Sequence, residues 1–188
     1  LTGTAMLGAV AAVLMYLEFP IPIMPAFVKL DVSELPALIA SFAYGPVSGI
    51  LVCLIKNLIK LPSTSTAAVG ELFNFVMGAL FVGVAGLIYK RNKTRKGAIV
   101  GALLGALVMA VVSVPYNYFI VYPAYVVMYH LPLDAIIGMY QAINPNVNGL
   151  LACLLVFNLP FTFVKGALDA VLCFLVYKPL SPILHGRK

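Results

Sequence analysis

Four polar side chains recur at helical spacing along the last long apolar segment of the sequence. Asn158, Thr162, Lys165 and Asp169 lie at positions i, i+4, i+7 and i+11, which places them on one face of an α-helix. Ionisable groups inside an apolar membrane helix cost about 2.5–3.5 kcal/mol each on insertion scales, so they normally face a cavity or a partner. We therefore predict that this stripe lines a ligand pocket, with Lys165 and Asp169 spaced to pair with each other. The alternative is that the pair only packs one helix against its neighbours.

Two further polar positions stand at the ends of expected apolar helices. Asn117 lies within the run Pro-Tyr-Asn-Tyr-Phe. It either contributes to the same pocket or belongs to an interfacial belt of aromatic side chains. Glu71 lies in the run Gly-Glu-Leu-Phe-Asn, where the first helical turn leaves backbone N–H groups unpaired. Those donors can bind a ligand rich in carbonyl groups, whereas Glu71 itself can instead stabilise the helix dipole.

The sequence carries no pattern for catalysis or metal binding. His130 and His185 are the only histidines, and neither belongs to a metal-binding motif such as H-E-x-x-H. The three cysteines are far apart and have neither a pairing pattern nor metal-ligand spacing. There is no G-x-S-x-G motif, no P-loop and no cluster of carboxylates in the sequence. We therefore predict no catalytic residue, no metal and no cofactor, and we exclude a transporter that hydrolyses ATP by itself.

The composition is that of an integral membrane protein. Of the 188 residues, 63% are hydrophobic and 10% are charged, and the mean hydropathy is +1.06. Soluble domains have roughly 45–50% apolar and about 25% charged residues. Since a membrane helix needs about 20 residues, the chain has room for six short-looped spans. We predict an all-α integral membrane protein in which residues 1–188 form a single domain, a compact bundle of six transmembrane helices.

Proline, glycine and polar residues separate the expected spans. The spans cover residues 2–16, 33–44, 47–59, 71–89, 97–115 and 158–177. Residues 19–31 are rich in proline and should be extended rather than helical. Residues 118–157 either continue the fifth span beyond a kink or form short re-entrant helices. Pro179 and Pro182 should end the sixth span.

The net charge is +6, and most of the positive charge lies in one loop and in the C-terminal tail. The membrane explains this placement better than a nucleic acid does, so we expect no nucleic-acid partner. Residues 90–96 carry five positive and no negative side chains, and Lys and Arg are enriched in cytoplasmic loops. Six spans then place both termini in the cytoplasm. The proline-rich, Ser/Thr-rich and irregular connections all face outward, which indicates an outward-facing ligand pocket.

Small residues repeat every four positions on two of the expected helices. Gly97, Gly101 and Gly105 do so on the fifth span, and Ala5 and Ala9 do so on the first. Small side chains let membrane helices approach closely. Each ladder can serve packing within the bundle or a docking surface for a second membrane protein.

The order of these features resembles the substrate-binding S components of energy-coupling factor (ECF) vitamin importers, most of all their riboflavin-specific branch. The stretch KNLIKLPSTSTAAVGELFNFVMG at residues 56–78 carries most of the likeness, and the proline-rich loop, the alanine ladder and the basic loop add to it. The resemblance implies a monomeric six-helix subunit of the bacterial cell membrane that binds one vitamin near the outer face. It also implies a complex with a membrane scaffold subunit and two ATPase subunits.

The resemblance also implies roles for individual residues. In such proteins the alanine ladder of the first helix contacts the scaffold, and the first loop and helices four to six contact the ligand. In this sequence the ladder is Ala5 and Ala9, and by position the ligand contacts include Phe27, Leu72, Asn117, Asn158 and Lys165.

Riboflavin suits a pocket of this kind. Its flat ring needs apolar and aromatic walls, and its ribityl chain and ring carbonyls need a few placed polar groups. We expect Met24 and Phe27 to wall the ring, with Asn117, Asn158 and Lys165 as hydrogen-bonding groups. Riboflavin would be the transported ligand and not a cofactor.

Three alternatives remain at this point. The first keeps the family and changes the vitamin. The second is an intramembrane enzyme that uses Glu71 or Asp169. The third is a small secondary transporter with a charge relay between Lys165 and Asp169, which an internal inverted repeat would support; the sequence shows no such repeat.

Overall fold

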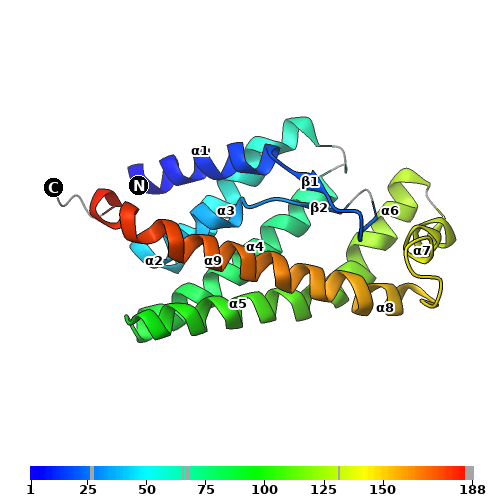
Figure 1. Cartoon of the computed structure of the whole chain (residues 1–188). Helices are drawn as coiled ribbons and strands as arrows, with labels where there is room; N and C mark the ends of the chain where they lie inside the picture. The colour runs from blue at the N-terminus through cyan, green and yellow to red at the C-terminus, as the bar shows by residue number, and fades with distance from the viewer. Residues whose placement is uncertain (26–27, 65, 67, 131, 185–188) are drawn as a thin grey trace.

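The protein is a bundle of nearly parallel and antiparallel helices with one short hairpin (Figure 1). The computed structural model describes residues 1–25, 28–64, 66, 68–130 and 132–184, with side chains described as far as residue 177. The α-helices within these residues are α1 (Thr2–Tyr16), α2 (Glu34–Tyr44), α3 (Pro46–Lys60), α4 (Val69–Arg91), α5 (Arg95–Tyr116), α6 (Tyr122–Tyr129), α7 (Leu133–Gln141), α8 (Leu150–Cys153) and α9 (Leu159–Leu184).

Shorter elements connect these helices. Two π-helical segments, Asn117–Val121 and Leu154–Asn158, join α5 to α6 and α8 to α9, so each pair forms one continuous helix. The strands β1 (Phe19–Pro20) and β2 (Lys29–Leu30) pair antiparallel. The described part of the proline-rich loop is therefore non-helical as expected, because proline cannot continue a helix, but only its two ends are extended, and the chain turns at residues 22–24. A 3₁₀ turn, Leu61–Ser63, follows α3.

Four helices are long and apolar enough to cross a membrane within the described residues. They are Pro46–Ser63, Val69–Arg91, Arg95–Tyr129 and Leu150–Tyr177. The apolar helix α1 is shorter. Helix α2 has 11 residues, or about 16 Å at 1.5 Å per residue, whereas the hydrocarbon layer is about 30 Å thick. The all-helical, multi-pass fold is confirmed, and the count of six spans stays a prediction.

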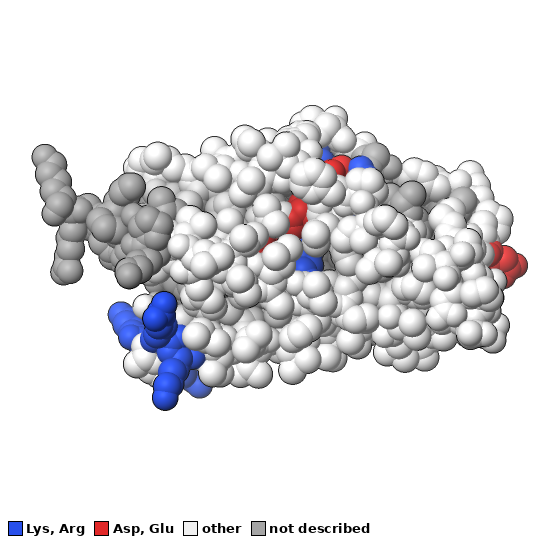
Figure 2. Space-filling view, viewed as in Figure 1, with Lys and Arg blue, Asp and Glu red and all other residues white. Residues whose placement is uncertain are grey.

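The exterior of the bundle is apolar, as a lipid environment requires. Leucine, isoleucine and valine side chains on the outer face of α5 are about half exposed, among them Leu103, Leu107 and Val111. Figure 2 shows that uncharged residues cover nearly all of the visible face between the two ends of the molecule. A soluble monomer rarely exposes so continuous an apolar surface.

Helix α2 forms the centre of the core. Most of its side chains are buried, including Leu38 and Phe42, and it packs against α1, α3, α4 and α9. The glycine ladder of α5 packs inward, since a Cβ on Gly101 or Gly105 would lie 2.8 Å from Ala85 O or 2.5 Å from Phe81 O of α4. This ladder therefore serves packing within the bundle.

The alanine ladder of α1 has the opposite placement. Ala5 and Ala9 are exposed, whereas Gly8, Ala11 and Ala12 on the other face of α1 are buried. Met6, Val10 and Val13 are exposed with them, so this face is largely apolar. It is available to lipid or to a second membrane protein.

The region after the fifth expected span is now defined. Residues 118–129 continue the fifth helix through the π segment, and α7 follows as a separate short helix. The last helix begins at Leu150 and not at Asn158, because Gly149, with φ +83°, is the residue that breaks the chain direction.

The expected end of the last helix at residue 177 was wrong. The helix continues to Leu184, past Pro179 and Pro182. Both prolines fall in the last two turns of the helix. Each removes one backbone hydrogen bond there, and little helix follows that this loss could destabilise.

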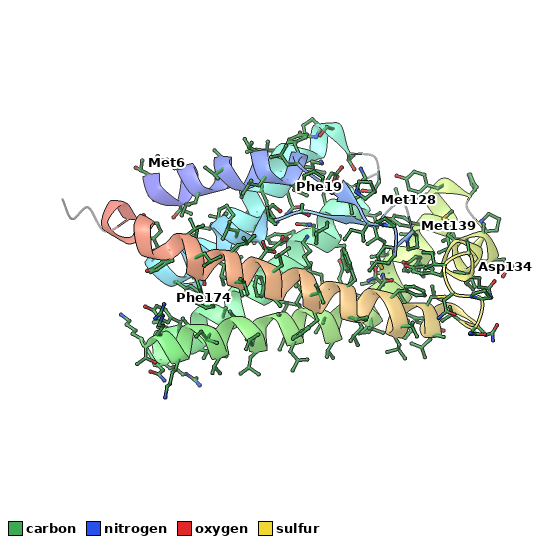
Figure 3. All side chains as sticks on the ribbon, viewed as in Figure 1. Met6, Phe19, Met128, Asp134, Met139 and Phe174 are labelled. Carbon is green, nitrogen blue, oxygen red and sulfur yellow. The ribbon has the colours of Figure 1, made fainter. Side chains whose placement is uncertain are left out.

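The two ends of the bundle differ in character. The start of α1, the end of α9 and the α4–α5 turn lie at one end, and α6 and α7 lie at the other (Figure 1). Basic side chains gather at the first end in Figure 2, where Lys90, Arg91, Lys93, Arg95 and Lys96 are exposed. Asp134 and Met139 of α7 mark the opposite end in Figure 3. We expect the basic end to be cytoplasmic.

Candidate functional site

A cavity of about 200 Å³ lies where the hairpin loop, α4, the two π segments and α9 meet. Its aromatic and methionine surface comes from both ends of the sequence and from the middle. That surface includes Met15, Phe73, Met77, Met109, Tyr122, Tyr125 and Phe161. Uncharged polar groups interrupt it at Thr66, Asn74, Asn117, Asn158 and Thr162. Charged residues complete the wall: Glu18, Lys29, Asp31, Glu34, Lys60, Glu71 and Lys165. An apolar and aromatic surface combined with placed polar groups is the usual make-up of a small-molecule site.

Lys165 lines this cavity and is held by acidic groups from the first quarter of the chain. Its Nζ lies 2.9 Å from Asp31 Oδ2 and 3.2 Å from Glu34 Oε2. Asp31 directly follows β2, and Glu34 begins α2. These ion pairs join α9 to the hairpin loop at the cavity wall.

Lys56 completes what we call the buried charge cluster, formed by Asp31, Ser33, Glu34, Lys56 and Lys165. Lys56 Nζ donates to Glu34 Oε1 at 2.8 Å and to Ser33 Oγ at 2.6 Å, and the Ser33 hydroxyl donates to Asp31. Two lysines and two carboxylates thus compensate each other, which buried charges require. Burial alone would raise the pKa of Asp31, but its ion pairs with Lys165 and Lys56 and the Ser33 hydrogen bond hold that pKa well below its usual 3.8.

Asp169 does not form the expected pair with Lys165. Its side chain is fully buried one helical turn further along α9. Within the described residues, neither of its carboxyl oxygens accepts a hydrogen bond. Spacing of four residues permits a pair but does not force one. Here Asp31 and Glu34 offer the lysine two carboxylates at hydrogen-bonding distance.

The first π segment positions Asn117. Pro115 removes a backbone donor just before it. Tyr122 N–H then donates to Asn117 O, five residues back instead of four, which widens the turn without ending the helix. Asn117 Nδ2 donates to Ser113 O at 2.8 Å. Its Oδ1 can accept a hydrogen bond from a ligand, and the second hydrogen of Nδ2 is a further donor.

The second π segment, Leu154–Asn158, positions the other asparagine just before Pro160. Asn158 Oδ1 accepts a hydrogen bond from the Tyr140 hydroxyl at 2.7 Å, and Asn158 Nδ2 lies 3.4 Å from the Tyr122 hydroxyl. The two tyrosine hydroxyls are 2.5 Å apart. All three side chains are buried, so their polar atoms form a closed ring beside the cavity.

Glu71 is held at the cavity wall by the loop that precedes α4. The hydroxyls of Thr64 and Thr66 donate to its Oε2 at 2.7 and 2.9 Å. Thr66 Oγ1 also accepts a hydrogen bond from Gly70 N–H at 3.1 Å. This donor of the first turn of α4 is therefore engaged within the protein, and Glu71 complements both the threonines and the helix dipole.

Surface ion pairs tie the hairpin to α1 and α3. Lys29 Nζ lies 2.6 Å from Glu18 Oε1, and Lys60 Nζ lies 3.6 Å from the same oxygen. Lys60 Nζ also lies 4.3 Å from the centre of the Tyr16 ring. Because Lys29 and Glu18 are partly exposed, their pair contributes little stability. The contact between Asp31 and Lys165 is the stronger anchor of this loop.

The structure brings four of the predicted ligand contacts together. All four line the cavity: Lys165, Asn158, Asn117 and Thr162. The two asparagines lie on the π segments, and Thr162 and Lys165 lie on α9. Their role as ligand contacts stays a prediction.

The other predicted contacts lie elsewhere. Met24 is buried in the hairpin loop but is not part of the cavity wall. Leu72 is 52% exposed, because the helix turns it away from the side on which Glu71 and Phe73 line the cavity. Phe27 lies outside the described residues.

Sequence reasoning missed several residues that build this site. Asp31, Glu34 and Lys56 were not assigned to it, nor were Tyr122 and Tyr140. A signal for the first three was available, because charged groups within or beside apolar segments normally meet a partner. The two tyrosines gave no such signal, since tyrosine is common in apolar and interfacial segments alike.

Comparison with protein families identifies the family to which this chain belongs. The family model of the ECF transporter substrate-specific component matches residues 1–177. The chain belongs to the substrate-specific components of ECF transporters.

Known members of this family match nearly the whole chain. The riboflavin transporter RibU of Staphylococcus aureus (strain TCH60) is 34% identical, with 96% of this chain and 89% of that protein covered. The riboflavin transporter FmnP of Bacillus subtilis (strain 168) is 34% identical, with 100% and 95% covered. A solved S component of a bacterial ECF transporter has a TM-score of 0.76 at 33% identity, with 97% of this chain and 95% of that chain covered.

Membership of the family settles the class of the protein. A substrate-specific component is the substrate-binding subunit of a membrane transporter and not an enzyme. The structure agrees with a multi-pass protein of the cell membrane that works with further subunits of its transporter.

Proposed function

We propose that this substrate-specific component binds riboflavin in the cavity between the hairpin loop, α4 and α9. It then delivers the vitamin through association with a membrane scaffold subunit and two ATPase subunits. Support comes from the two relatives that are named riboflavin transporters and match nearly the full chain. A third relative with that name, from Streptococcus thermophilus (strain ATCC BAA-250 / LMG 18311), is 32% identical over 96% of this chain.

The observation that carries the proposal is the pattern of donors and acceptors beside the aromatic and methionine surface of the cavity. Asn117 offers an acceptor through its Oδ1, while one of its two Nδ2 hydrogens is bound to Ser113 O. Asn158 and Lys165 offer N–H donors on the same cavity wall. The isoalloxazine ring presents two carbonyl oxygens on either side of one N–H, which needs donors on either side of an acceptor. The aromatic wall suits the flat ring.

The charge balance of the site favours an uncharged ligand. Lys165 is already paired with Asp31 and Glu34, and Glu71 is bound by two threonines. A phosphorylated flavin would bring two negative charges to a cavity whose lining lysines, Lys29, Lys60 and Lys165, each already contact a carboxylate. Riboflavin carries no charge at neutral pH and is the better fit.

The exposed face of α1 is the proposed docking surface. Ala5 and Ala9 leave the helix backbone open to close approach by a second membrane helix. We further propose that the protein alone is a monomer with six membrane helices. Its basic end and both termini lie in the cytoplasm, and the cavity opens outward.

Titration of the purified protein with riboflavin tests this function. Flavin fluorescence should be quenched on binding, and the protein as isolated should absorb in the flavin bands. Thiamine and biotin at a tenfold excess should not displace the flavin. If riboflavin neither binds nor co-purifies while another vitamin does, the ligand is wrong and the family assignment stands.

The secondary-transporter alternative is not favoured by the geometry. A charge relay along α9 needs contact between Lys165 and Asp169. The lysine is instead paired with Asp31 and Glu34.

A further inference from the structure

The hydrogen-bonded ring of Asn158, Tyr140 and Tyr122 joins three separate elements. Tyr140 belongs to α7, Tyr122 begins α6, and Asn158 ends the second π segment. Asn158 and Tyr122 line the cavity, whereas Tyr140 is not part of the cavity wall. Tyr140 can therefore influence a bound ligand only through its neighbours.

The directions of donation within the ring fix the orientation of the amide. The Tyr140 hydroxyl donates its single hydrogen to Asn158 Oδ1, so Tyr122 must be the donor in the contact between the two hydroxyls. One hydrogen of Asn158 Nδ2 is then directed to Tyr122 over a long 3.4 Å. The second hydrogen is not used by the ring. The amide thus offers the cavity an N–H donor while its oxygen is engaged.

The surroundings of Tyr140 hold its hydroxyl in place. The residue is fully buried with Ile136 and Leu154 in a cluster separate from the main core. Its ring packs against Phe157 with ring centres 5.4 Å apart. Helix α7, whose Asp134 and Met139 are labelled in Figure 3, is thereby joined to the α8–α9 helix at the end of the bundle opposite the termini.

We propose that Tyr140 is a positioning residue that makes Asn158 a hydrogen-bond donor to the ligand, so that α7 determines which polar edge the cavity accepts. The inference rests on the proposed function and deepens it, because the matching group would be a ring carbonyl or ring nitrogen of the flavin. An amide turned the other way would present its oxygen and repel those acceptors.

A double-mutant cycle in riboflavin affinity tests this role, with Tyr140→Phe, Asn158→Ala and the double variant measured by fluorescence quenching. Tyr140→Phe keeps the ring and removes only the hydroxyl. In the wild-type background it should weaken binding by about 2- to 12-fold, the range that one neutral hydrogen bond spans. In the Asn158→Ala background it should change the affinity by less than about 2-fold, because the amide it acts through is gone. Tyr118→Phe, on the exposed side of the first π segment, is the matched control and should leave binding unchanged.

The outcomes separate the two proposals. Failure of the wild-type protein to bind riboflavin would overturn the proposed function and this inference with it. Wild-type binding combined with an equal effect of Tyr140→Phe in both backgrounds would overturn only the inference, since a purely structural tyrosine acts regardless of Asn158.

A second variant covers the case in which Tyr140→Phe does not fold. Asn158→Asp still accepts the Tyr140 hydrogen bond but has no N–H for the ligand. It should therefore lose affinity to the same degree as Asn158→Ala. Unchanged riboflavin binding by folded Asn158→Asp would contradict the assigned orientation.

Discussion

At the scale of single residues, Lys165 belongs both to the cavity wall and to the buried charge cluster. Lys165→Met should weaken riboflavin binding by about 10- to 150-fold, since a hydrogen bond from a charged donor contributes about 1.5–3 kcal/mol. It should also lower the unfolding temperature in detergent, because Asp31 and Glu34 lose a partner. Calorimetric titration and thermal unfolding measure the two effects, and Lys90→Met, at an exposed position in the last turn of α4, is the control.

A second substitution separates these two effects. Lys165→Met combined with Asp31→Asn removes the stranded carboxylate together with the lysine, so much of the lost stability should return. Affinity should stay low, because the donor to the ligand is still absent. Wild-type affinity in the double variant would mean that Lys165 only supports the fold.

Substitution of Asp169, unlike that of Lys165, should leave riboflavin affinity unchanged. Asp169→Asn removes no hydrogen bond that the described residues make, and the side chain lies outside the cavity wall. Riboflavin affinity should therefore stay within about 2-fold of wild type. A loss of tenfold or more in the same titration would show that the carboxyl group does support Lys165 when the ligand is bound.

The partner of Lys165 shows what a sequence can and cannot predict at this scale. Burial of an ionisable stripe on α9 was predictable from the cost of charge in an apolar helix. The partner was not, because a helix offers only local candidates such as Asp169, whereas Asp31 lies 134 positions away. Tertiary packing alone decides that choice.

At the scale of elements, the contact between α4 and α5 depends on glycine. Gly105→Ala should destabilise the protein by about 1–3 kcal/mol, since the new Cβ would meet the Phe81 carbonyl and overpack the contact. Gly138→Ala is the matched control on α7, where a Cβ meets nothing within 4 Å, and it should be neutral or slightly stabilising. Thermal unfolding of both variants measures this, and equal effects would contradict the close approach.

Helix α1 should have a separate role in transport. Ala9→Leu fills the exposed ladder without entering the core, so riboflavin binding should be unchanged while uptake by cells that carry the full transporter falls. Ala135→Leu makes the same change on an exposed position of α7 and should leave uptake intact. Parallel loss of binding and uptake in Ala9→Leu would show that the ladder supports the fold itself.

The helix positions were largely predictable, and the irregularities between them were not. Apolar runs bounded by proline and glycine located α1, α3 and α4 to within two or three residues. The π segments escaped prediction because Pro115 and Pro160 read equally well as helix ends. Only the surrounding bundle shows that the chain continues through a widened turn, and those turns place Asn117 and Asn158.

At the scale of the whole molecule, orientation in the membrane decides which side the cavity serves. A cysteine in place of Thr94, in the basic turn, should resist an impermeant thiol reagent in intact cells. A cysteine in place of Asn146, exposed near the opposite end, should react. The three native cysteines are buried and should add little background. The reverse labelling pattern would place the cavity on the cytoplasmic side.

The central claim is that riboflavin occupies the cavity between the hairpin loop, α4 and α9. An experimental structure of the riboflavin-bound protein tests it most directly. We predict the isoalloxazine ring against the aromatic wall, with Asn117, Asn158 and Lys165 within about 3.2 Å of its polar atoms. Riboflavin found at another place on the protein, with this cavity empty, would contradict the account.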